Sequence, residues 1–317
     1  MNTLRDWFSK RSPAPSPPSV IAAAAAPTGA TGQSTIPIEG PPPATGVLNP
    51  PEVPHPSQIH FATSYHVGRV RSHNEDTLFT FSSNLNGNDS FPSFGVFIVA
   101  DGMGGHHMGE RASSAAAKTM GRVIVEKLFL GLLRGYAAQP EQLQQVMEEA
   151  MQAANRAVSE QAPGGGTTLT AALIYGRQVT LAHVGDSRAY LVEDKGLMAV
   201  TRDHSLVQRM VELGQISPDE AAYHPHKNVL IRAVGQDEEL EVDLSTTPLG
   251  GGSRLLLCSD GLWGLVNDAE LFHLITTSPS LQTACDGMVQ AANAAGGPDN
   301  IAAILIELPR SSSEGRV

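Results

Sequence analysis

The sequence predicts an α+β fold, because its strands favour antiparallel pairing and its helical segments do not alternate with them. Segments 169–175 and 178–184 are rich in strand-forming residues and are joined by the tight turn Gly176-Arg177, which implies an antiparallel hairpin. The helical segments follow one another in pairs. A doubly wound parallel sheet would instead place a helix between successive strands.

The folded region is expected to span residues 58–309. Its expected strands are 60–65, 77–81, 95–100, 169–175, 178–184, 189–192, 254–258 and 301–307. Its expected helices are 110–133, 141–161, 269–277 and 281–295. In the second helix Leu143, Val146, Met147 and Ala150 share one face, and Pro163 with the three glycines after it ends that helix.

Residues 1–57 differ from the rest of the chain, since they hold 13 of its 22 prolines among Ala, Gly, Ser and Thr in no regular order. Such a segment buries too little apolar surface to offset the entropy of ordering it. We therefore expect a disordered Pro/Ala-rich N-terminal tail, with a short docking peptide at Leu4, Trp7 and Phe8 as the alternative. Residues 310–317 are expected to form a flexible C-terminal tail.

The composition argues against several classes of protein. The formal net charge of -11 and the pI of about 5.4 disfavour binding to nucleic acid or to an anionic membrane, because both need clustered Lys and Arg. No apolar run reaches the roughly 20 residues that span a bilayer, and the first residues lack the apolar stretch of an export signal. With only Cys258 and Cys285, no disulfide framework is implied and a cytoplasmic setting is expected.

Five aspartates carry the main functional signal, and four of them directly adjoin apolar strands. They are Asp76, Asp101, Asp186, Asp260 and Asp299. A carboxylate at such an edge is partly desolvated and needs a partner to stay ionised, yet too few basic residues lie nearby to pair all five. One such acid alone would be interpreted as a turn residue that accepts from a backbone N–H. Five together predict a site for Mg²⁺ or Mn²⁺, which prefer oxygen ligands.

The glycines after Asp101 support this interpretation. Gly102, Gly104 and Gly105 let the backbone approach a ligand closely and adopt positive φ, so the Gly102 carbonyl is a candidate metal ligand. Taken alone, this glycine-rich string would also suit a plain turn. His106 and His107 are left out of the site because hard cations favour oxygen, and Cys258 is expected to be a buried core residue.

Eight segments, in order, match the motifs of a known family. They read VGRVRSHNED (67–76), VADGMGGH (99–106), GTT (166–168), HVGDSRAY (183–190), DHSLVQ (203–208), HPHKN (224–228), LLCSDGLW (256–263) and GPDNI (297–301). In these motifs the chain resembles the metal-dependent protein phosphatases of type 2C, the PPM family, and specifically their bacterial serine/threonine phosphatase branch. The match covers nearly all of the expected folded region.

The resemblance implies a central β-sandwich of two antiparallel sheets flanked by pairs of helices, in four layers (α-β-β-α). It also implies two catalytic Mn²⁺ or Mg²⁺ ions at one end of the sandwich, and a third, weaker ion. By position in the motifs, Asp101 would bridge the two ions and the Gly102 carbonyl would bind one of them. Asp260 and Asp299 would hold the other ion.

The remaining roles are carried over in the same way. Asp76 would act in or just outside the ligand set, with Glu75 as a further contributor, and Asp186 would hold the third ion together with Asp260. Arg71 would donate a forked pair of hydrogen bonds to the substrate phosphate. The expected catalytic residues are therefore Arg71, Asp101 and Asp260.

The implied reaction is hydrolysis of phosphoserine and phosphothreonine in proteins. A hydroxide bridging the two ions would attack phosphorus in line, without a covalent enzyme intermediate. Two positions depart from parts of the family. Met103 stands where many eukaryotic members have a histidine proposed as general acid, and His66 stands where bacterial members usually have Asp.

Phosphorylated proteins are the expected partners, among them a serine/threonine kinase and its substrates, and the chain is expected to be a monomer. Two alternatives stay open: a phosphatase for a partner-switching regulator of transcription, and a catalytically silent homologue that only binds phosphoproteins. In the bacterial relatives the segment equivalent to 203–235 is a mobile flap beside the metal site. We expect selection among phosphopeptides there, with Met210 and His226 as candidate positions.

Deletion of residues 1–57 should leave the thermal midpoint and the turnover of p-nitrophenyl phosphate nearly unchanged, because the segment is expected to bury little surface. Calorimetry and steady-state kinetics on the full and shortened chains test this. A loss of solubility or activity on deletion would show that the segment packs on the folded region.

Overall fold

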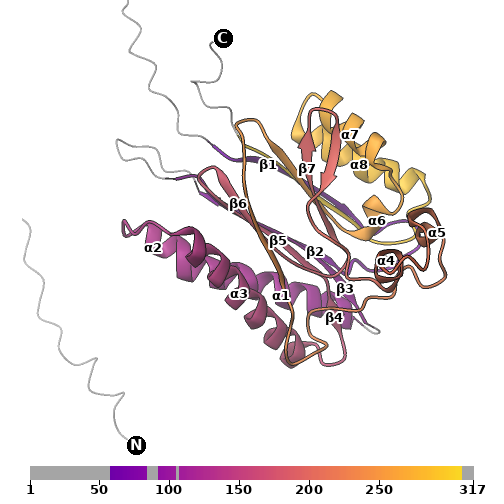
Figure 1. Cartoon of the computed structure of the whole chain (residues 1–317), viewed down its shortest axis with the longest axis horizontal. Helices are drawn as coiled ribbons and strands as arrows, with labels where there is room; N and C mark the ends of the chain where they lie inside the picture. Colours follow the sequence, from indigo (N-terminus) through magenta and orange to yellow (C-terminus); the bar gives the residue numbers. More distant parts are fainter. Residues whose placement is uncertain (1–57, 84–91, 105–106, 309–317) are drawn as a thin grey trace, which may run out of the picture. The chain divides into compact units, whose positions relative to one another are not determined.

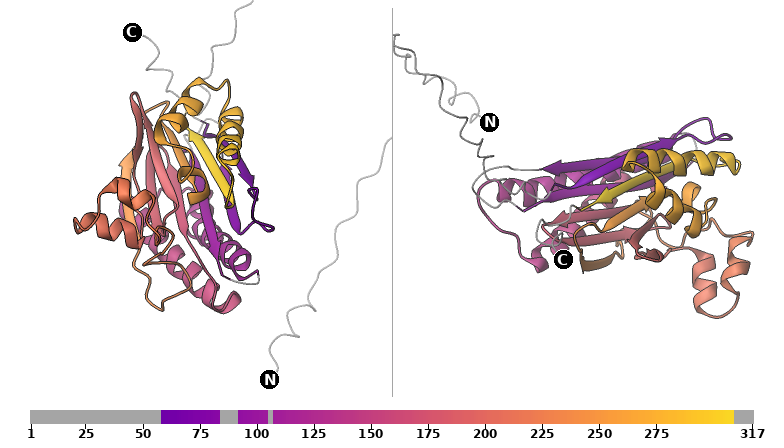
Figure 2. Two further views of the ribbon diagram at one scale, coloured as in Figure 1. Left: turned by 90° about the vertical axis from the view of Figure 1, so that its right-hand side faces the viewer. Right: turned by 90° about the horizontal axis from the view of Figure 1, so that it is seen from above.

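The computed structural model describes residues 58–83, 92–104 and 107–308. The two expected tails lie outside these residues, as do the candidate docking peptide at Leu4, Trp7 and Phe8, and Gly105 and His106. The described residues form four layers, with two facing sheets in the middle and helices on both outer sides (Figures 1 and 2). The predicted α+β sandwich is thereby confirmed.

The first sheet has five strands in the order β1-β11-β10-β7-β8. These strands are β1 (His60–His66), β11 (Ile301–Glu307), β10 (Arg254–Cys258), β7 (Arg188–Glu193) and β8 (Gly196–Ala199). Every neighbouring pair is antiparallel, and β11, the last strand in sequence, lies between β1 and β10. The two chain ends of the folded region are therefore paired inside one sheet.

The second sheet has the order β2-β3-β5-β6-β9, with a short strand β4 also paired to β3. Its strands are β2 (Asp76–Ser83), β3 (Phe94–Met103), β4 (Gly166–Thr167), β5 (Leu169–Tyr175), β6 (Gln178–Val184) and β9 (Asp243–Pro248). The predicted hairpin at Gly176 joins β5 and β6 in antiparallel register. Gly176 has φ +59, a left-handed conformation that favours glycine.

Strand β3 is buried on both faces, and its alternating side chains divide between two cores. Val96, Ile98 and Ala100 pack against the outer helices, whereas Phe97 and Val99 pack between the sheets. This period-two division is the geometry of an extended chain. The sequence GVFIVA lacks polar alternation because neither face of the strand meets water.

The outer helices pack in pairs. On the second sheet lie α1 (Met108–Ile124) and α3 (Pro140–Gln161), and on the first lie α7 (Asp268–Thr277) and α8 (Leu281–Ala294). The expected single helix 110–133 is divided, since α1 is followed by the π-helical turn η1 (Val125–Phe129) and by α2 (Leu130–Leu132). The three pieces still place Val123, Leu128 and Leu132 in the core.

Several elements were not predicted. They are β4, β8, β9 and the short helices α5 (Pro218–Ala222) and α6 (Asp260–Trp263), and α4 (Leu206–Glu212) lies within the segment 203–235. Strand β9 reads DLSTTP and lies at the edge of its sheet, so half-exposed polar side chains are tolerated there. Its Pro248 is at the end of the strand, where proline is accommodated.

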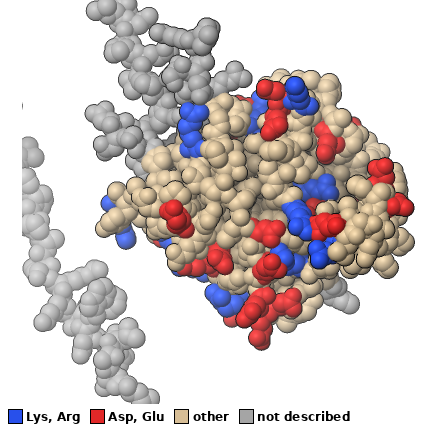
Figure 3. All heavy atoms as spheres, in the orientation of Figure 1, with Lys and Arg blue, Asp and Glu red and all other residues tan. Residues whose placement is uncertain are grey.

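On the face drawn in Figure 3, acidic and basic side chains are interspersed, without a large area of one sign. None of the helices within the described ranges is both long enough and apolar enough to cross a membrane.

Candidate metal centre

The five predicted aspartates come together at one end of the sandwich, from both sheets. Asp76 begins β2 and lies directly opposite Asp101 of β3 in the antiparallel register. The carboxyl of Asp101 lies close enough to those of Asp76 and Asp260 for their charges to raise its pKa. Asp186 follows β6, Asp260 opens α6 after β10, and Asp299 precedes β11. Residues up to 223 positions apart in sequence thus form one acidic cluster.

Close backbone packing holds Asp101 and Gly102 in place. The Asp101 N–H donates to Thr168 Oγ1 at 2.9 Å, and the Asp101 carbonyl accepts from the Thr168 N–H and the Thr167 hydroxyl, both at 2.8 Å. A Cβ atom on Gly102 would lie 2.1 Å from the carbonyl oxygen of Gly109. No other residue fits at position 102 without moving α1.

Ser259 connects the two sheets beside the cluster. Its hydroxyl donates to Asp76 Oδ2 at 2.8 Å and accepts from the Ala302 N–H at 3.0 Å. Ser259 follows β10 in the first sheet, and Asp76 begins β2 in the second. This contact therefore fixes one carboxylate of the second sheet against a strand end of the first.

Burial and mutual repulsion disfavour the charged forms of these acids. Burial raises the pKa of Asp76 to about 7 and that of Asp186 to about 8, with the charge of Asp260 adding to both shifts. Burial, followed by the charge of Asp76, also raises the pKa of Asp101 well above its usual range. The pKa of Asp260 is raised by burial and by Asp299. The positive charge of Arg188 opposes the shift at Asp186 only in part.

The donor set fits a hard divalent cation. Asp76 Oδ1 and Asp260 Oδ1 are buried and have no hydrogen-bond partner in the structure, a state that is costly without a cation or water. Within the described residues no three His, Cys, Asp or Glu side chains already stand as a closed ligand group. Mg²⁺ and Mn²⁺ do not need such a group, because Mg²⁺ in particular keeps several waters and binds through one or two carboxylates.

Arg71 and Glu75 lie at the rim of the cluster. Arg71 Nη2 donates to Asp299 Oδ2 at 2.8 Å, and the Arg71 side chain is about half exposed (49%). This contact with Asp299 raises the pKa of Arg71, so the guanidinium stays charged. Burial raises the pKa of Glu75, whose carbonyl accepts from the Gly102 N–H at 3.1 Å. His66, which stands where bacterial members usually have Asp, accepts at Nδ1 from the Gly68 N–H at 2.9 Å.

The turn that carries Asp186 is fastened from two other elements. Trp263 Nε1 of α6 donates to the Asp186 carbonyl at 3.0 Å. The Arg188 guanidinium lies 3.4 Å from the centre of the Trp263 ring and makes two hydrogen bonds to the Asp203 carboxylate, at 2.8 and 2.9 Å. Asp203 begins the segment 203–235, so this segment is attached directly beside Asp186.

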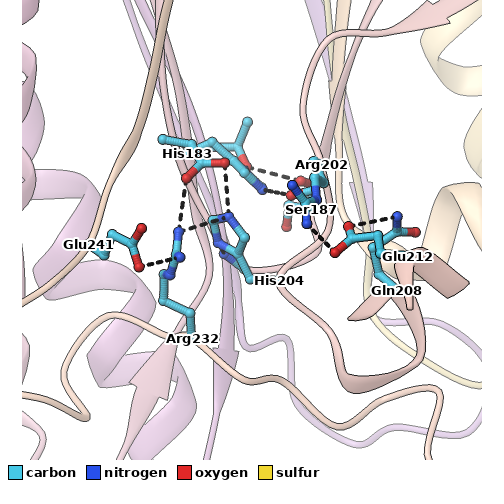
Figure 4. A network of polar contacts seen from close by, with 11 residues as sticks. His183, Ser187, Arg202, His204, Gln208, Glu212, Arg232 and Glu241 are labelled. Atoms are coloured by element: carbon cyan, nitrogen blue, oxygen red, sulfur yellow. Dashed lines mark hydrogen bonds and ion pairs between the residues drawn. The ribbon is translucent and has the colours of Figure 1, made fainter. Parts of the chain in front are cut away.

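A second polar network attaches the same segment on the other side of Asp186. His204 Nδ1 accepts from the Gly185 N–H at 3.1 Å, and its Nε2 lies 3.2 Å from Asp243 Oδ2. Arg232 donates to Asp243 Oδ1 at 2.9 Å and to Glu241. Figure 4 shows His204 at the centre of this network, with Arg232 and Glu241 on one side and Arg202 with Glu212 on the other. The base of 203–235 is thus held on both sides of Asp186.

A cavity of about 550 Å³ separates helices α4 and α5 from α6 and reaches the acidic cluster. Its apolar lining comes from both sides, namely Val207, Val211, Pro218, Ala221, Ala222, Trp263, Leu265 and Pro298. Asp186, Asp260 and Asp299 line the same cavity. Of the two positions singled out from the sequence, neither Met210 nor His226 is among the lining residues; Val207 and Val211 of α4 are.

A buried end of a β-sandwich that gathers five carboxylates, with an arginine at its rim, defines a class of hydrolase that works with hard divalent cations on anionic substrates. The particular family follows from direct comparison. A family model described as "Protein phosphatase 2C" matches residues 69–305. The chain belongs to this family, and it is a serine/threonine protein phosphatase that depends on Mn²⁺ or Mg²⁺.

Individual relatives agree with this assignment. The chain is 37% identical over 246 residues to the "Serine/threonine phosphatase stp" of Listeria innocua, covering 76% of this chain and 92% of the relative. It is similar to the crystal structure of the Mycobacterium tuberculosis serine/threonine phosphatase PstP/Ppp, with a TM-score of 0.68 and 31% identity over 80% of this chain and 99% of that one. A PstP catalytic domain in complex with two manganese ions gives a TM-score of 0.65 at 30% identity, over 79% of this chain and 98% of that one.

The acidic cluster should destabilise the metal-free protein as pH rises. Asp76 and Asp186 have folded pKa values of about 7 and 8, above the value near 3.9 of an unfolded chain. Between the unfolded and the folded pKa values the folded state binds more protons than the unfolded chain does, so the stability of the fold decreases as pH increases. In EDTA, the thermal midpoint should drop between pH 5 and pH 8.

Asp76→Asn should raise that midpoint at pH 8 by roughly 3 °C or more, the shift produced by about 1 kcal/mol in a domain of this size. The variant keeps an acceptor for Ser259 but removes one charge. Glu160→Gln, on an exposed position of α3, is the matched control. An Asp76→Asn midpoint at or below that of the control would contradict the proposed repulsion.

Proposed function

We propose that the carboxylates of this cluster hold the catalytic ions in the roles expected from the sequence. Asp101 pairs with Asp76 in the sheet register and feels the charge of Asp260 as well, which supports a bridging role for it. The Gly102 carbonyl would serve one ion, and Asp260 with Asp299 the other. The single observation that carries the proposal is the pair of buried carboxylate oxygens, Asp76 Oδ1 and Asp260 Oδ1, that lack any partner.

The outer positions complete the proposal. Asp186 would hold a third ion with Asp260, since the charge of Asp260 raises the pKa of Asp186 and both acids line one cavity. Glu75 would contribute from the rim of the site. When bound, the ions supply an activated water for attack on phosphorus and offset the charge of the phosphoryl oxygens. The chain's own residues orient the phosphate and enclose the site.

Arg71 is the proposed phosphate-binding group. A guanidinium offers two parallel N–H donors to a phosphate, which a lysine does not. In this structure one of those donors is engaged with Asp299 Oδ2. Arg71 would therefore exchange this carboxylate for the substrate phosphate, as Asp299 turns to its ion.

For physiological partners, we infer a serine/threonine kinase and its phosphorylated substrates, and action as a monomer in the cytoplasm. Cys258 and Cys285 are both buried and unpaired, which suits a reducing compartment. The alternative of a silent phosphoprotein-binding homologue is disfavoured, because all five aspartates and Arg71 are present in one cluster. A phosphatase for a partner-switching transcription regulator would use the same chemistry, and phosphopeptide profiling distinguishes the two substrates.

The cavity beside the metal centre is the proposed site of selection among phosphopeptides. It is continuous with Asp260 and Asp299, so a residue flanking the phosphorylated one would enter it as the phosphate reaches the cluster. Its apolar lining from α4 and from Trp263 favours an apolar flanking side chain. The small substrate p-nitrophenyl phosphate has no such flanking group.

Removal of divalent cations should abolish turnover of p-nitrophenyl phosphate and of a phosphothreonine peptide, and added Mn²⁺ or Mg²⁺ should restore it. Asp101→Asn and Asp260→Asn should each reduce kcat by at least about 1000-fold, because each would lose a charged ligand. Cys258→Ser, in a buried strand near Asp260, should retain activity. Full activity in EDTA, with the metal content verified as nil, would refute the metal-dependent mechanism.

Val211→Ala should lower kcat/KM about 10-fold for peptides with a bulky apolar residue beside the phosphothreonine, the usual effect of removing methyl groups from a specificity pocket. Turnover of p-nitrophenyl phosphate should be unchanged. Met210→Ala, in the same helix but outside the cavity lining, is the matched control. Equal losses on every substrate would show that Val211 only packs the segment.

A further inference from the structure

Asn300 is a buried side chain that joins the loop before β2 to the turn before β11. Only 4% of its surface is exposed. Its Nδ2 group donates to the carbonyls of Val67 and His73, at 2.9 and 2.8 Å. Its Oδ1 accepts from the Glu75 N–H at 2.7 Å. All three partners belong to the loop 67–75, so one amide group holds the loop at its beginning and at its end.

This loop carries Arg71, whose side chain lies at the rim of the metal centre. Glu75, whose N–H donates to Asn300, also accepts at its carbonyl from the Gly102 N–H at 3.1 Å and from the Ser113 hydroxyl at 2.6 Å. Asn300 is thereby connected through a single residue to the end of β3. The loop, β3 and the start of β11 meet at this one side chain.

The loop also lies very close to the turn that contains Asp299. The Arg69 N–H donates to the Gly297 carbonyl at 2.7 Å. Gly68 has φ +84, and a Cβ atom there would lie 2.2 Å from the Asp299 carbonyl oxygen. The backbone is therefore positioned tightly, whereas the Arg71 side chain is half exposed. The direction of Arg71 depends on the backbone that carries it.

We propose that Asn300 is a positioning residue for phosphate recognition. It holds the loop 67–75 in the shape from which Arg71 reaches the phosphate of a phosphomonoester beside the acidic cluster. The proposal rests on the phosphate-binding role proposed above for Arg71. The position needs two donors and one acceptor on a short planar group, which asparagine provides and aspartate does not. Glutamine is longer by one methylene and would not fit the same three distances.

Another buried asparagine provides a control. Asn155 in α3 is 1% exposed, and it holds a different loop in the same manner. Its Oδ1 accepts from the Gly235 N–H at 2.6 Å, and its Nδ2 donates to the Asp237 carbonyl at 2.8 Å. Truncation of either asparagine removes buried hydrogen bonds, so both variants should lose stability to a similar extent. Only truncation of Asn300 should weaken the binding of phosphate.

The test uses the full chain loaded with Mn²⁺, with p-nitrophenyl phosphate as substrate and inorganic phosphate as competitive inhibitor. Asn300→Ala should raise KM and the phosphate Ki about 10-fold with a smaller change in kcat, as Arg71→Ala should. In the Arg71→Ala background, Asn300→Ala should change KM less than about twofold, because the two residues then act through one interaction. Asn155→Ala should leave KM and Ki unchanged.

Each outcome separates the two proposals. An unchanged KM in Arg71→Ala would overturn the role of Arg71 itself. If Arg71→Ala raises KM and Asn300→Ala does not, or if the two effects multiply in the double variant, Asn300 has only a structural role. A weaker apparent affinity for Mn²⁺ in Asn300→Ala, without a change in Ki, would instead assign Asn300 to the placement of Asp299. If Asn300→Ala is unfolded at the assay temperature, the same measurements on Asn300→Asp decide, since it keeps the acceptor for Glu75 and loses both donors.

Discussion

Mutual repulsion among buried carboxylates is the constraint on which the rest of this structure depends. Asp76, Asp101 and Asp260 are brought close together although burial and like charge each oppose their ionisation. Only rigid surroundings keep such groups together, because mobile chains would separate them. The β-sandwich supplies that rigidity through three apolar cores, one between the sheets and one beneath each helical layer.

Buried hydrogen bonds add to the rigidity that the apolar cores provide. Thr168 fixes the backbone of Asp101, Ser259 orients the carboxylate of Asp76, and Asn300 holds the loop before β2. All three are almost fully buried and fully engaged. Removing any one of them would leave a buried group unpaired, which costs more than the net gain of an ordinary hydrogen bond. The site is therefore supported by polar side chains that are buried away from solvent.

The sequence was sufficient to predict the fold class and the gathering of the five aspartates, for clear physical reasons. Strands such as 95–100 and 301–307 are continuous apolar runs, and the acids beside them stand out against that background. The family motifs then indicated the sandwich. The predictions that failed concern single elements. β9 is a polar edge strand and β4 has only two residues. The helix expected at 110–133 is interrupted by a π-helical turn that contains neither glycine nor proline.

The supporting polar residues could not be found by the same route. Ser259 and Asn300 lie inside the quoted motifs, but a serine or asparagine next to an aspartate is equally typical of a plain turn. His204 acts on Gly185, 19 positions away, through a contact that depends on how the two segments cross. Val211 and Trp263 line one cavity, and no periodicity of the sequence predicts that cavity. Such pairings are properties of the assembled chain.

The division of the acidic cluster between the two sheets has a mechanical consequence. Asp76 and Asp101 belong to one sheet, whereas Asp260 and Asp299 adjoin strands of the other. The two sheets otherwise face each other through side chains such as Phe97 and Leu257, and apolar contacts resist sliding only weakly because they have no direction. Cations bound by acids of both sheets would link the two sheets at this end. Sliding of one sheet past the other would then also disrupt the site that binds the ions.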